Sequence, residues 1–231
     1  MALTDGLKSE IAGIFREKWE VRDGYVIPEP DNLGLGNDAV NLDATVLYAD
    51  MAESTELVNN YKPHFAAEIY KSYLTCCAKI IKQNGGQITA YDGDRVMGVY
   101  IGESKNSNAT KTALKINYAV RNIITPAMKA QYPTTSYTLN HSVGVDTSKI
   151  LVARVGVRNA NDLVWVGRAA NYAAKLCALR DGTYASWITG DVYDKLSAET
   201  KVTNGKNMWE ERVWKARGDL RIYRSNWEWA S

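Results

Sequence analysis

The chain has 231 residues, of which 45% are hydrophobic and 23% are charged, as in an ordinary globular protein. Its formal net charge of +2 is too small to predict a nucleic-acid partner or binding to an anionic membrane surface. No apolar run reaches the roughly 20 residues of a transmembrane helix, and the N-terminal segment carries too many charges for a signal peptide. The three cysteines, Cys76, Cys77 and Cys177, have no metal-ligand spacing, so we expect a reducing compartment, the cytoplasm.

The first 42 residues predict a helix followed by an extended arm. Apolar residues recur at helical spacing over residues 4–20, which indicates an amphipathic helix. Residues 25–42 contain Pro28, Pro30 and several glycines without periodicity, so we expect a loop or an extended arm there. We expect this arm to pack on its own domain or on a second copy of the chain.

Residues 43–231 predict one domain in which helices and strands are mixed. Apolar runs, helical periodicity and turn residues define its elements. In chain order we expect a strand at 43–50, helices at 53–61 and 63–84, a hairpin at 87–101, a loop at 103–110, a helix from 113 interrupted near 126, paired strands at 134–146 and 149–155, a strand at 163–166, a helix at 167–180, a strand at 186–189, a short helix from 191, and a hairpin of 209–214 with 220–223. Because neighbouring strands often form hairpins, we expect an α+β fold with a largely antiparallel sheet and helices packed on one face.

Two aspartates follow apolar runs at what we expect to be the same end of the sheet. Asp50 ends the strand at 43–50, and Asp94 lies in the turn of the hairpin at 87–101. Two carboxylates placed together can hold hard divalent cations such as Mg²⁺ or Mn²⁺, which prefer oxygen ligands and phosphate substrates. From spacing alone, the alternative that both are ordinary turn aspartates stays open.

Three segments resemble, in the same order, the motifs of class III nucleotidyl cyclases. Tyr48-Ala-Asp50-Met-Ala-Glu-Ser-Thr55 resembles the first metal motif of that family, and Gly93-Asp94-Arg-Val-Met97 resembles the second. Gly167-Arg-Ala-Ala-Asn171-Tyr-Ala-Ala-Lys175 resembles the segment in which a glycine begins a helix and an asparagine and an arginine follow at four-residue intervals. The resemblance covers residues 43–225 and implies a ferredoxin-like sheet.

The resemblance implies a lyase in which the ribose 3′-hydroxyl of a nucleoside triphosphate attacks the α-phosphate and pyrophosphate leaves. Asp50 and Asp94, with the carbonyl of Met51, would hold two Mn²⁺ or Mg²⁺ ions per active site. The backbone of residues 51–55, which ends in Ser54 and Thr55, would cradle the phosphates.

The cations and the amide of the implied site come from later in the chain. Asn171 and Lys175 share one helix face and would meet the sugar and the phosphate. The family usually has arginine at position 175; lysine keeps the charge but loses the planar fork. Lys215 or Arg217 would contact the terminal phosphates, because Lys215-Ala-Arg217-Gly218 resembles a late basic turn of the family. Since the family takes the aspartates and the asparagine helix from different subunits, a homodimer with C2 symmetry and interfacial active sites is implied.

The two positions with which the family selects adenine or guanine are Ala90 and Val164 in this chain. Neither side chain can form hydrogen bonds, and a buried polar edge left unpaired costs about 1–3 kcal/mol. Large neighbours, Tyr48, Tyr91 and Trp165, would shrink the base pocket. We therefore expect a pyrimidine substrate.

This combination, together with the arm that carries Pro28, resembles the pyrimidine cyclases of bacterial Pycsar antiphage systems. It implies conversion of UTP to 3′,5′-cyclic UMP, which a separate effector would sense. Synthesis of cyclic CMP from CTP stays open, and Tyr48, Tyr91 and Arg95 are the candidates for reading the base. The competing hypotheses are a purine nucleotide cyclase, a catalytically dead nucleotide-binding domain and a ferredoxin-like RNA-binding domain.

Overall fold

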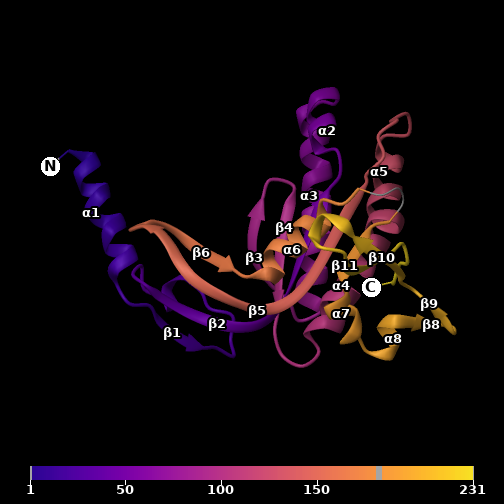
Figure 1. Cartoon of the computed structure of the whole chain (residues 1–231). Helices are drawn as coiled ribbons and strands as arrows, with labels where there is room; N and C mark the ends of the chain where they lie inside the picture. The colour runs from indigo at the N-terminus through magenta and orange to yellow at the C-terminus, as the bar shows by residue number, and fades with distance from the viewer. Residues whose placement is uncertain (1, 181–183, 231) are drawn as a thin grey trace.

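Two long antiparallel strands form the centre of the sheet in this computed structural model, which describes residues 2–180 and 184–230. They are β2 (Asp38–Met51) and β5 (His141–Val157), and they pair from Ala39 with Ala153 to Met51 with His141. The sheet has the order β10-β11-β7-β5-β2-β4-β3, with β1 added to β2 and β6 added to β5 (Figure 1). Apart from the parallel pairs β1–β2 and β5–β7, the strand pairs that the structure describes are antiparallel, which confirms the predicted α+β class.

The other elements follow in chain order. The remaining strands are β1 (Glu20–Asp23), β3 (Gln87–Asp92), β4 (Arg95–Tyr100), β6 (Ala160–Val166), β7 (Ser186–Thr189), β8 (Val202–Thr203), β9 (Lys206–Asn207), β10 (Glu210–Trp214) and β11 (Leu220–Ser225). The helices and helical turns are α1 (Leu3–Arg16), η1 (Pro30–Asn32), α2 (Ser54–Asn60), α3 (Pro63–Gln83), α4 (Lys105–Ala119), η2 (Val120–Ile124), α5 (Thr125–Gln131), α6 (Arg168–Cys177), α7 (Gly190–Asp194), α8 (Ala198–Lys201) and η3 (Lys215–Arg217). No helix in the described part of the chain is long and apolar enough to cross a membrane.

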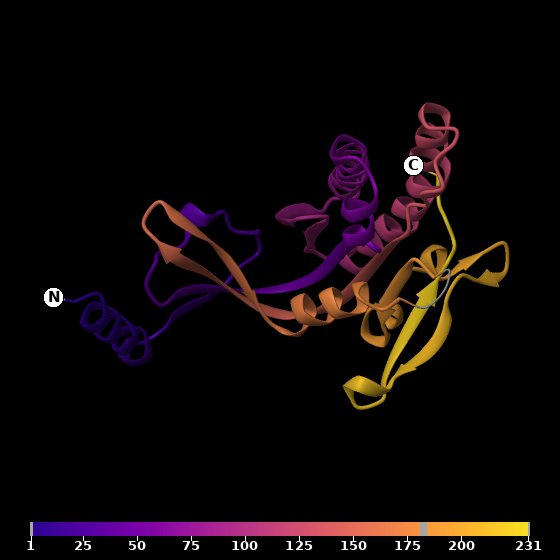
Figure 2. The ribbon, with the colours of Figure 1, turned by 90° about the horizontal axis from the view of Figure 1, so that it is seen from above.

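Helices cover both faces of the sheet, so the expectation of helices on one face is wrong. Leu47 and Ala49 of β2 belong to the core cluster that contains residues of α3 and α4, whereas Ala44 and Val46 belong to the cluster that contains residues of α6. The ribbon seen from above shows helices on both sides of the sheet (Figure 2). Because alternate residues of a strand point to opposite faces, a β2 that is apolar at consecutive positions requires cover on both sides.

The predicted loop at 103–110 is wrong, because α4 begins at Lys105. Its first turns are polar but buried by specific pairing. The Lys105 ammonium lies 2.9 Å from an Asp43 carboxylate oxygen, and the Thr45 hydroxyl donates to the Asn106 amide oxygen at 3.0 Å. Buried polar groups with partners are compatible with a core helix, and the sequence pattern does not show those partners.

The predicted hairpin of 134–146 with 149–155 is also wrong, because β5 continues through this region as one strand and begins only at His141. The polar run Asp146-Thr147-Ser148-Lys149 is typical of a turn. In the structure the Thr147 hydroxyl donates to the Ala44 carbonyl at 3.2 Å, across to β2. This side-chain pairing keeps the polar run within the sheet.

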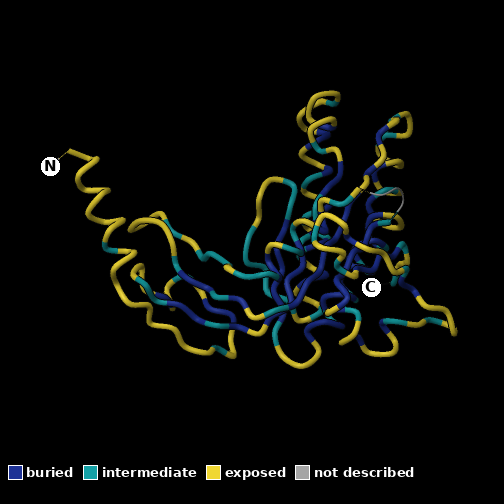
Figure 3. The backbone as a smooth tube through the Cα atoms, in the orientation of Figure 1, coloured by how far each residue is buried: buried dark blue, intermediate teal, exposed yellow. Residues whose placement is uncertain are grey.

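The N-terminal segment extends away from the helix-covered part of the sheet (Figure 1). Helix α1 ends at Arg16, earlier than predicted, and β2 begins at Asp38, so the division that we proposed at residues 42 and 43 falls within β2. Among the described residues, α1 contributes none to the core, and its apolar side is exposed (Figure 3). Helix α1 therefore adds no residue to the core, whereas the arm at 25–42 packs on its own domain, as expected, with Ile27 and Leu33 buried in the cluster that contains Val46.

Candidate active site

Asp50 is the penultimate residue of β2 and lies between Arg95 of β4 and Ser142 of β5. The Asp50 side chain is 20% exposed, and burial is the main cause that raises the pKa of its carboxyl group. The negative charge of Asp94 raises this pKa further, while Arg180 and Arg95 oppose the shift. Asp94 directly precedes Arg95, which pairs with Asp50 across the two strands, so the two aspartates lie near one another at this end of the sheet.

Asp94 lies in the tight turn between β3 and β4. Gly93, just before it, has a φ of 62°, a left-handed conformation that glycine adopts without a steric penalty. Asp94 is half-buried, and its carboxylate forms no hydrogen bond or ion pair with any residue that the structure describes. The turn thus presents a carboxylate that is available to an external ligand.

The oxygen atoms at this end of the sheet fit hard divalent cations. No group of three or more His, Cys, Asp or Glu side chains able to hold a metal occurs in residues 2–180 and 184–230. The protein supplies two carboxylates and the Met51 carbonyl, and such a set is typical of ions that are completed by substrate phosphates. The Arg180 side chain places a positive charge there, because its guanidinium group contacts both Asp50 and the Met51 carbonyl.

Arg180 is a residue of the candidate site that sequence reasoning missed. Its Nη2 lies 3.1 Å from Asp50 Oδ2 and 3.3 Å from the Met51 carbonyl oxygen, and its Nη1 donates to the Cys177 carbonyl at 2.7 Å. No motif indicates this arginine, because Asp50 lies 130 positions earlier in the chain. Only the packing of α6 beside β5 brings the two together.

The segment after Asp50 turns sharply before α2. Glu53 has a φ of 59°, in the left-handed region, and α2 begins at the next residue, Ser54. Ser54 is half-buried and Thr55 is exposed. The backbone of this segment therefore lies directly beside Asp50 and Met51, where the sequence predicts the phosphates.

Helix α6 begins after Gly167, as predicted, and ends at Cys177. Its buried side is narrow, because Ala169 and Ala173 allow close packing on the sheet. Asn171 and Lys175 lie on the exposed side, and within the described residues neither side chain has a hydrogen-bond partner. Their spacing on one face confirms the predicted juxtaposition of an amide and a cation.

Both ends of α6 are fixed by arginines. At its start, Arg168 lies 3.1 Å from the fully buried carboxylate of Asp146 and also pairs with Asp191. At its end, Arg180 holds Asp50. These two ion pairs define the position of the exposed face between them.

The basic turn η3 lies beside α6. The rings of Tyr172 on α6 and Trp214 at the end of β10 pack edge-to-face with centroids 5.7 Å apart. The Arg217 guanidinium lies 5.6 Å from the centroid of the Trp214 ring, and Lys215 is exposed. The structure thus places both predicted turn cations close to the helix that carries Asn171.

Comparison with known proteins identifies the family. No protein-family model matches the chain. A curated uridylate cyclase from Xanthomonas perforans is 51% identical over 230 residues, covering 99% of each chain. One from Burkholderia cepacia is 49% identical over 231 residues with the same coverage. The chain belongs to the uridylate cyclase family. It is therefore a nucleotidyl cyclase, a phosphorus–oxygen lyase.

The fold of this uridylate cyclase family member is that of a class III cyclase catalytic domain. An adenylyl cyclase from P. aeruginosa superimposes with a TM-score of 0.67 and 18% identity, covering 81% of this chain and 95% of the other. At this identity the likeness shows the fold alone. It agrees with the class III motifs found in the sequence.

The residues predicted to lie on the base side of the site are only partly brought together. Tyr48, Ala90 and Trp165 pack against the same core cluster, and Arg95 lies over the Tyr48 ring at 5.2 Å from its centroid. Val164 lies next to Trp165 on β6 and therefore points to the opposite face of that strand. Val164 is thus not directed toward Tyr48.

Tyr91 lies away from the other base-side candidates. A bulge between Ile88 and Ala90 shifts the alternation of β3. As a result Tyr91, which is exposed, lines a groove against α3 with Ile88 and Leu74. The sequence does not indicate this bulge, and for this reason we expected Tyr91 in the same pocket as Tyr48.

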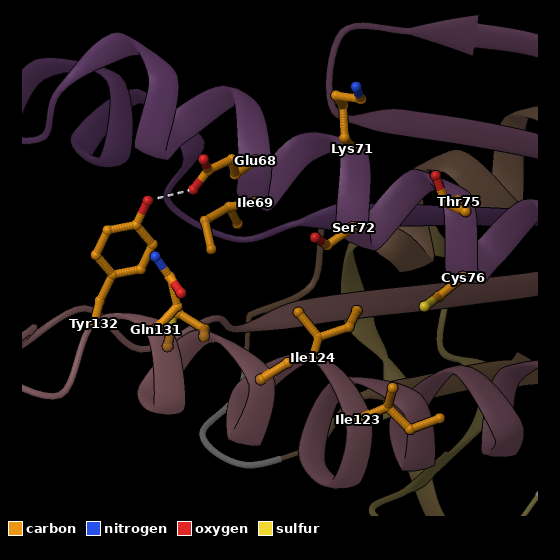
Figure 4. Close-up of a pocket in the computed structure, with 12 residues that line it drawn as sticks. Glu68, Ile69, Lys71, Ser72, Thr75, Cys76, Ile123, Ile124, Gln131 and Tyr132 are labelled. Atoms are coloured by element: carbon orange, nitrogen blue, oxygen red, sulfur yellow. Dashed lines mark hydrogen bonds between the residues drawn. The ribbon is translucent and has the colours of Figure 1, made fainter.

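A separate apolar groove lies between α3 and α5 of the cyclase (Figure 4). Ile69, Ile124 and Tyr132 line it, and the Tyr132 hydroxyl donates to a Glu68 carboxylate oxygen at 2.5 Å. None of the predicted catalytic, metal-binding or base-side residues lines this groove. The candidate active site is therefore the end of the sheet at Asp50, not this groove.

Proposed function

We propose that the chain converts UTP to 3′,5′-cyclic UMP and pyrophosphate. The observation that carries the proposal is the full-length likeness, at 51% and 49% identity, to curated uridylate cyclases. The geometry supports it, because the carboxylates of Asp50 and Asp94 lie at one end of the sheet and the amide and cation of α6 are exposed.

In the proposed reaction a bond forms between the ribose O3′ and the α-phosphorus, the bond from that phosphorus to the β-phosphate oxygen breaks, and the proton of the 3′-hydroxyl is released to solvent. Asp50, Asp94 and the Met51 carbonyl would hold two divalent ions, Mn²⁺ or Mg²⁺. When bound, these ions supply acidification of the 3′-hydroxyl and neutralisation of the phosphates. Asn171 would orient the ribose, and Lys175 would stabilise the charge that develops on the α-phosphate.

The departing pyrophosphate needs cations and a backbone cradle. The segment from Met51 to Thr55 lies next to the aspartates, and its N–H groups would hold phosphate oxygens. Lys215 and Arg217, in the turn packed beside α6, would pair with the terminal phosphates. These contacts would strengthen as negative charge moves to the leaving group.

We further propose that the active enzyme is a C2 homodimer with an active site at each side of the interface. Asn171 and Lys175 face outward from α6, and among the described residues no contact joins either one to Asp50 or Asp94. A second copy, placed with its α6 against Asp50, would complete the site. The two-fold symmetry would then generate a second, equivalent site.

The preference for a pyrimidine would rest on Tyr48, Arg95 and Ala90. Tyr48 is half-buried beneath the Arg95 guanidinium, which limits its freedom to move aside for a purine. Ala90 offers no hydrogen bond to a purine edge. CTP is the alternative substrate, because the two pyrimidines differ only at C4 and N3, and Arg95 is the group best placed to discriminate between them.

The biological proposal is that cyclic UMP, made in the cytoplasm upon phage infection, activates a separate effector that senses the cyclic nucleotide. It rests on the likeness of the arm and the catalytic segments to Pycsar cyclases. A catalytically dead domain is the competing proposal, based on lysine at position 175. The two carboxylates, Asp50 and Asp94, favour the active enzyme.

The test is incubation of the purified protein with Mn²⁺ and with UTP, CTP, ATP or GTP in separate reactions, followed by mass spectrometry. Cyclic UMP from UTP, and no product from Asp50→Asn, is the expected result. Cyclic CMP alone would correct the base, and a cyclic purine would contradict the interpretation of Tyr48 and Ala90. No product, with or without extract from phage-infected cells, would favour the dead domain.

A further inference from the structure

Arg180 occupies the position of a cation between two proposed metal ligands. Its Nη2 lies within hydrogen-bonding distance of both Asp50 Oδ2 and the Met51 carbonyl oxygen, at 3.1 and 3.3 Å. These are the oxygens that the proposed function assigns to a divalent ion. One positive group and one ion cannot both approach the same oxygens closely, because their charges repel and their positions overlap.

We propose that Arg180 is an internal cation that competes with the divalent metal for Asp50 and Met51. In the nucleotide-free chain it would hold the carboxylate in place and weaken metal binding. When a metal–triphosphate complex enters, the guanidinium would leave Asp50 and pair with a phosphate, for which its planar fork is suited. Metal binding would then depend on the nucleotide.

The surroundings of Arg180 allow this exchange. Its side chain is 40% exposed, so it can leave Asp50 without unfolding the sheet. Its Nη1 is also anchored to the end of α6, because it donates to the Cys177 carbonyl at 2.7 Å. Asp94 has no such partner among the described residues, so Arg180 blocks one carboxylate and leaves the other available.

A purely structural role predicts different behaviour. If Arg180 only orients Asp50, its removal would leave the carboxylate disordered and would weaken metal binding. If it competes, its removal would strengthen metal binding in the absence of nucleotide. The direction of the change in affinity therefore separates the two roles.

This proposal rests on the proposed metal site, and direct titration tests it without the reaction. Mn²⁺ is titrated into nucleotide-free protein, and free Mn²⁺ is measured by electron paramagnetic resonance. Arg180→Gln should lower the Kd for Mn²⁺ roughly five-fold, since a partly exposed ion pair is weak. Arg180→Lys should fall between wild type and Arg180→Gln, because it keeps the charge and loses the fork.

Two controls locate the effect. Arg22→Gln removes an arginine that also pairs with an aspartate, Asp38, at the far end of β2, and should leave the Kd unchanged. Asp50→Asn combined with Arg180→Gln should lose the gain, which would place the ion at Asp50. Circular dichroism checks that each variant is folded, and Arg180→Lys carries the test if Arg180→Gln is not.

An equal or higher Kd in the folded Arg180 variants, or no Mn²⁺ binding by any of them, would overturn the proposal. The cyclisation assay is read separately. Failure of wild type to make cyclic UMP would contradict the proposed function, while the Mn²⁺ titration would still decide whether Arg180 competes for the site.

Discussion

Gly144 of β5 lies directly beneath Ala173 of α6. A Cβ at Gly144 would stand 2.1 Å from the Ala173 carbonyl oxygen and 2.5 Å from the Cys177 nitrogen. The helix that carries Asn171 and Lys175 therefore depends on the absence of one side chain in the strand below it. Its position relative to Asp50 is set by this contact as well as by its terminal ion pairs.

Gly144→Ala should consequently destabilise the fold. Because backbone atoms cannot move as a flexible side chain can, the cost should be about 1–3 kcal/mol, typical of overpacking. Urea unfolding followed by circular dichroism measures it. Gly36→Ala is the matched control, since no heavy atom lies within 4 Å of its added Cβ and its φ lies outside the left-handed region. Equal stability of the two variants would contradict the tight packing of α6.

Mixing two inactive variants tests the shared active site. Asp50→Asn and Asn171→Ala should each abolish or strongly reduce cyclic UMP synthesis as pure proteins. In a C2 dimer, an equimolar mixture forms heterodimers in which one of two sites is intact, so activity should return to about a quarter of wild type. Product is quantified by mass spectrometry after subunit exchange. A mixture as inactive as its components would argue for a site within one chain.

Asp50→Asn should not lower the thermal stability of the metal-free protein, although it should abolish turnover. The folded state raises the Asp50 pKa above 3.8, chiefly through burial and then through Asp94, so its charged form is disfavoured on folding. Stability therefore falls as pH rises from 3.8 through the raised pKa, and a neutral amide removes that penalty at pH 7. Thermal unfolding with a chelator measures the midpoint. A clearly lower midpoint would show that the Arg180 pair outweighs burial.

Tyr48→Ala should relax the preference for a pyrimidine. Removing the ring that lies under Arg95 enlarges the base side of the site, so ATP or GTP turnover should rise relative to UTP turnover. The ratio of kcat/KM values for UTP and ATP measures the change. Tyr91→Ala is the matched control, because Tyr91 lines the groove against α3 and should leave that ratio unchanged. A shift with Tyr91→Ala instead would place the base on the other face.

Glu210→Gln should remove a pH-dependent contribution to stability that the wild-type C-terminal hairpin has. The Arg224 side chain is the main cause that lowers the pKa of Glu210 to about 2. A lowered carboxyl pKa stabilises the fold above the ordinary value of 4.5, and this contribution is lost as pH falls toward 2. Denaturant unfolding at pH 7 and pH 3 should therefore show a difference between wild type and Glu210→Gln that shrinks at low pH. A difference independent of pH would contradict the assigned cause.

Local sequence patterns were sufficient for the elements whose signals are contiguous. The start of α3 at Pro63, the β3–β4 hairpin around Gly93 and the start of α6 after Gly167 were all predicted. The residues that begin or end these elements are close in sequence to the elements themselves. The positions of Asn171 and Lys175 on one exposed face follow from helical spacing alone.

Patterns failed where distant partners decide the structure. Lys105 and Asn106 are helical because Asp43 and Thr45 bury and pair them, and polar content alone suggested a loop. Arg180 lies next to Asp50 only because α6 packs on the sheet. Hydrophobic periodicity contains no information about such pairs.

Helix α6 carries Asn171 and Lys175 on its exposed side and ends beside Arg180, which holds Asp50 of the same chain. In the proposed dimer, Asn171 and Lys175 serve the active site of the partner's aspartates, whereas Arg180 lies in the active site of its own Asp50. A displacement of α6 when UTP binds at one site would therefore be felt as a change in affinity at the other. The two sites would be coupled, and the dependence of rate on UTP concentration would depart from a simple hyperbola.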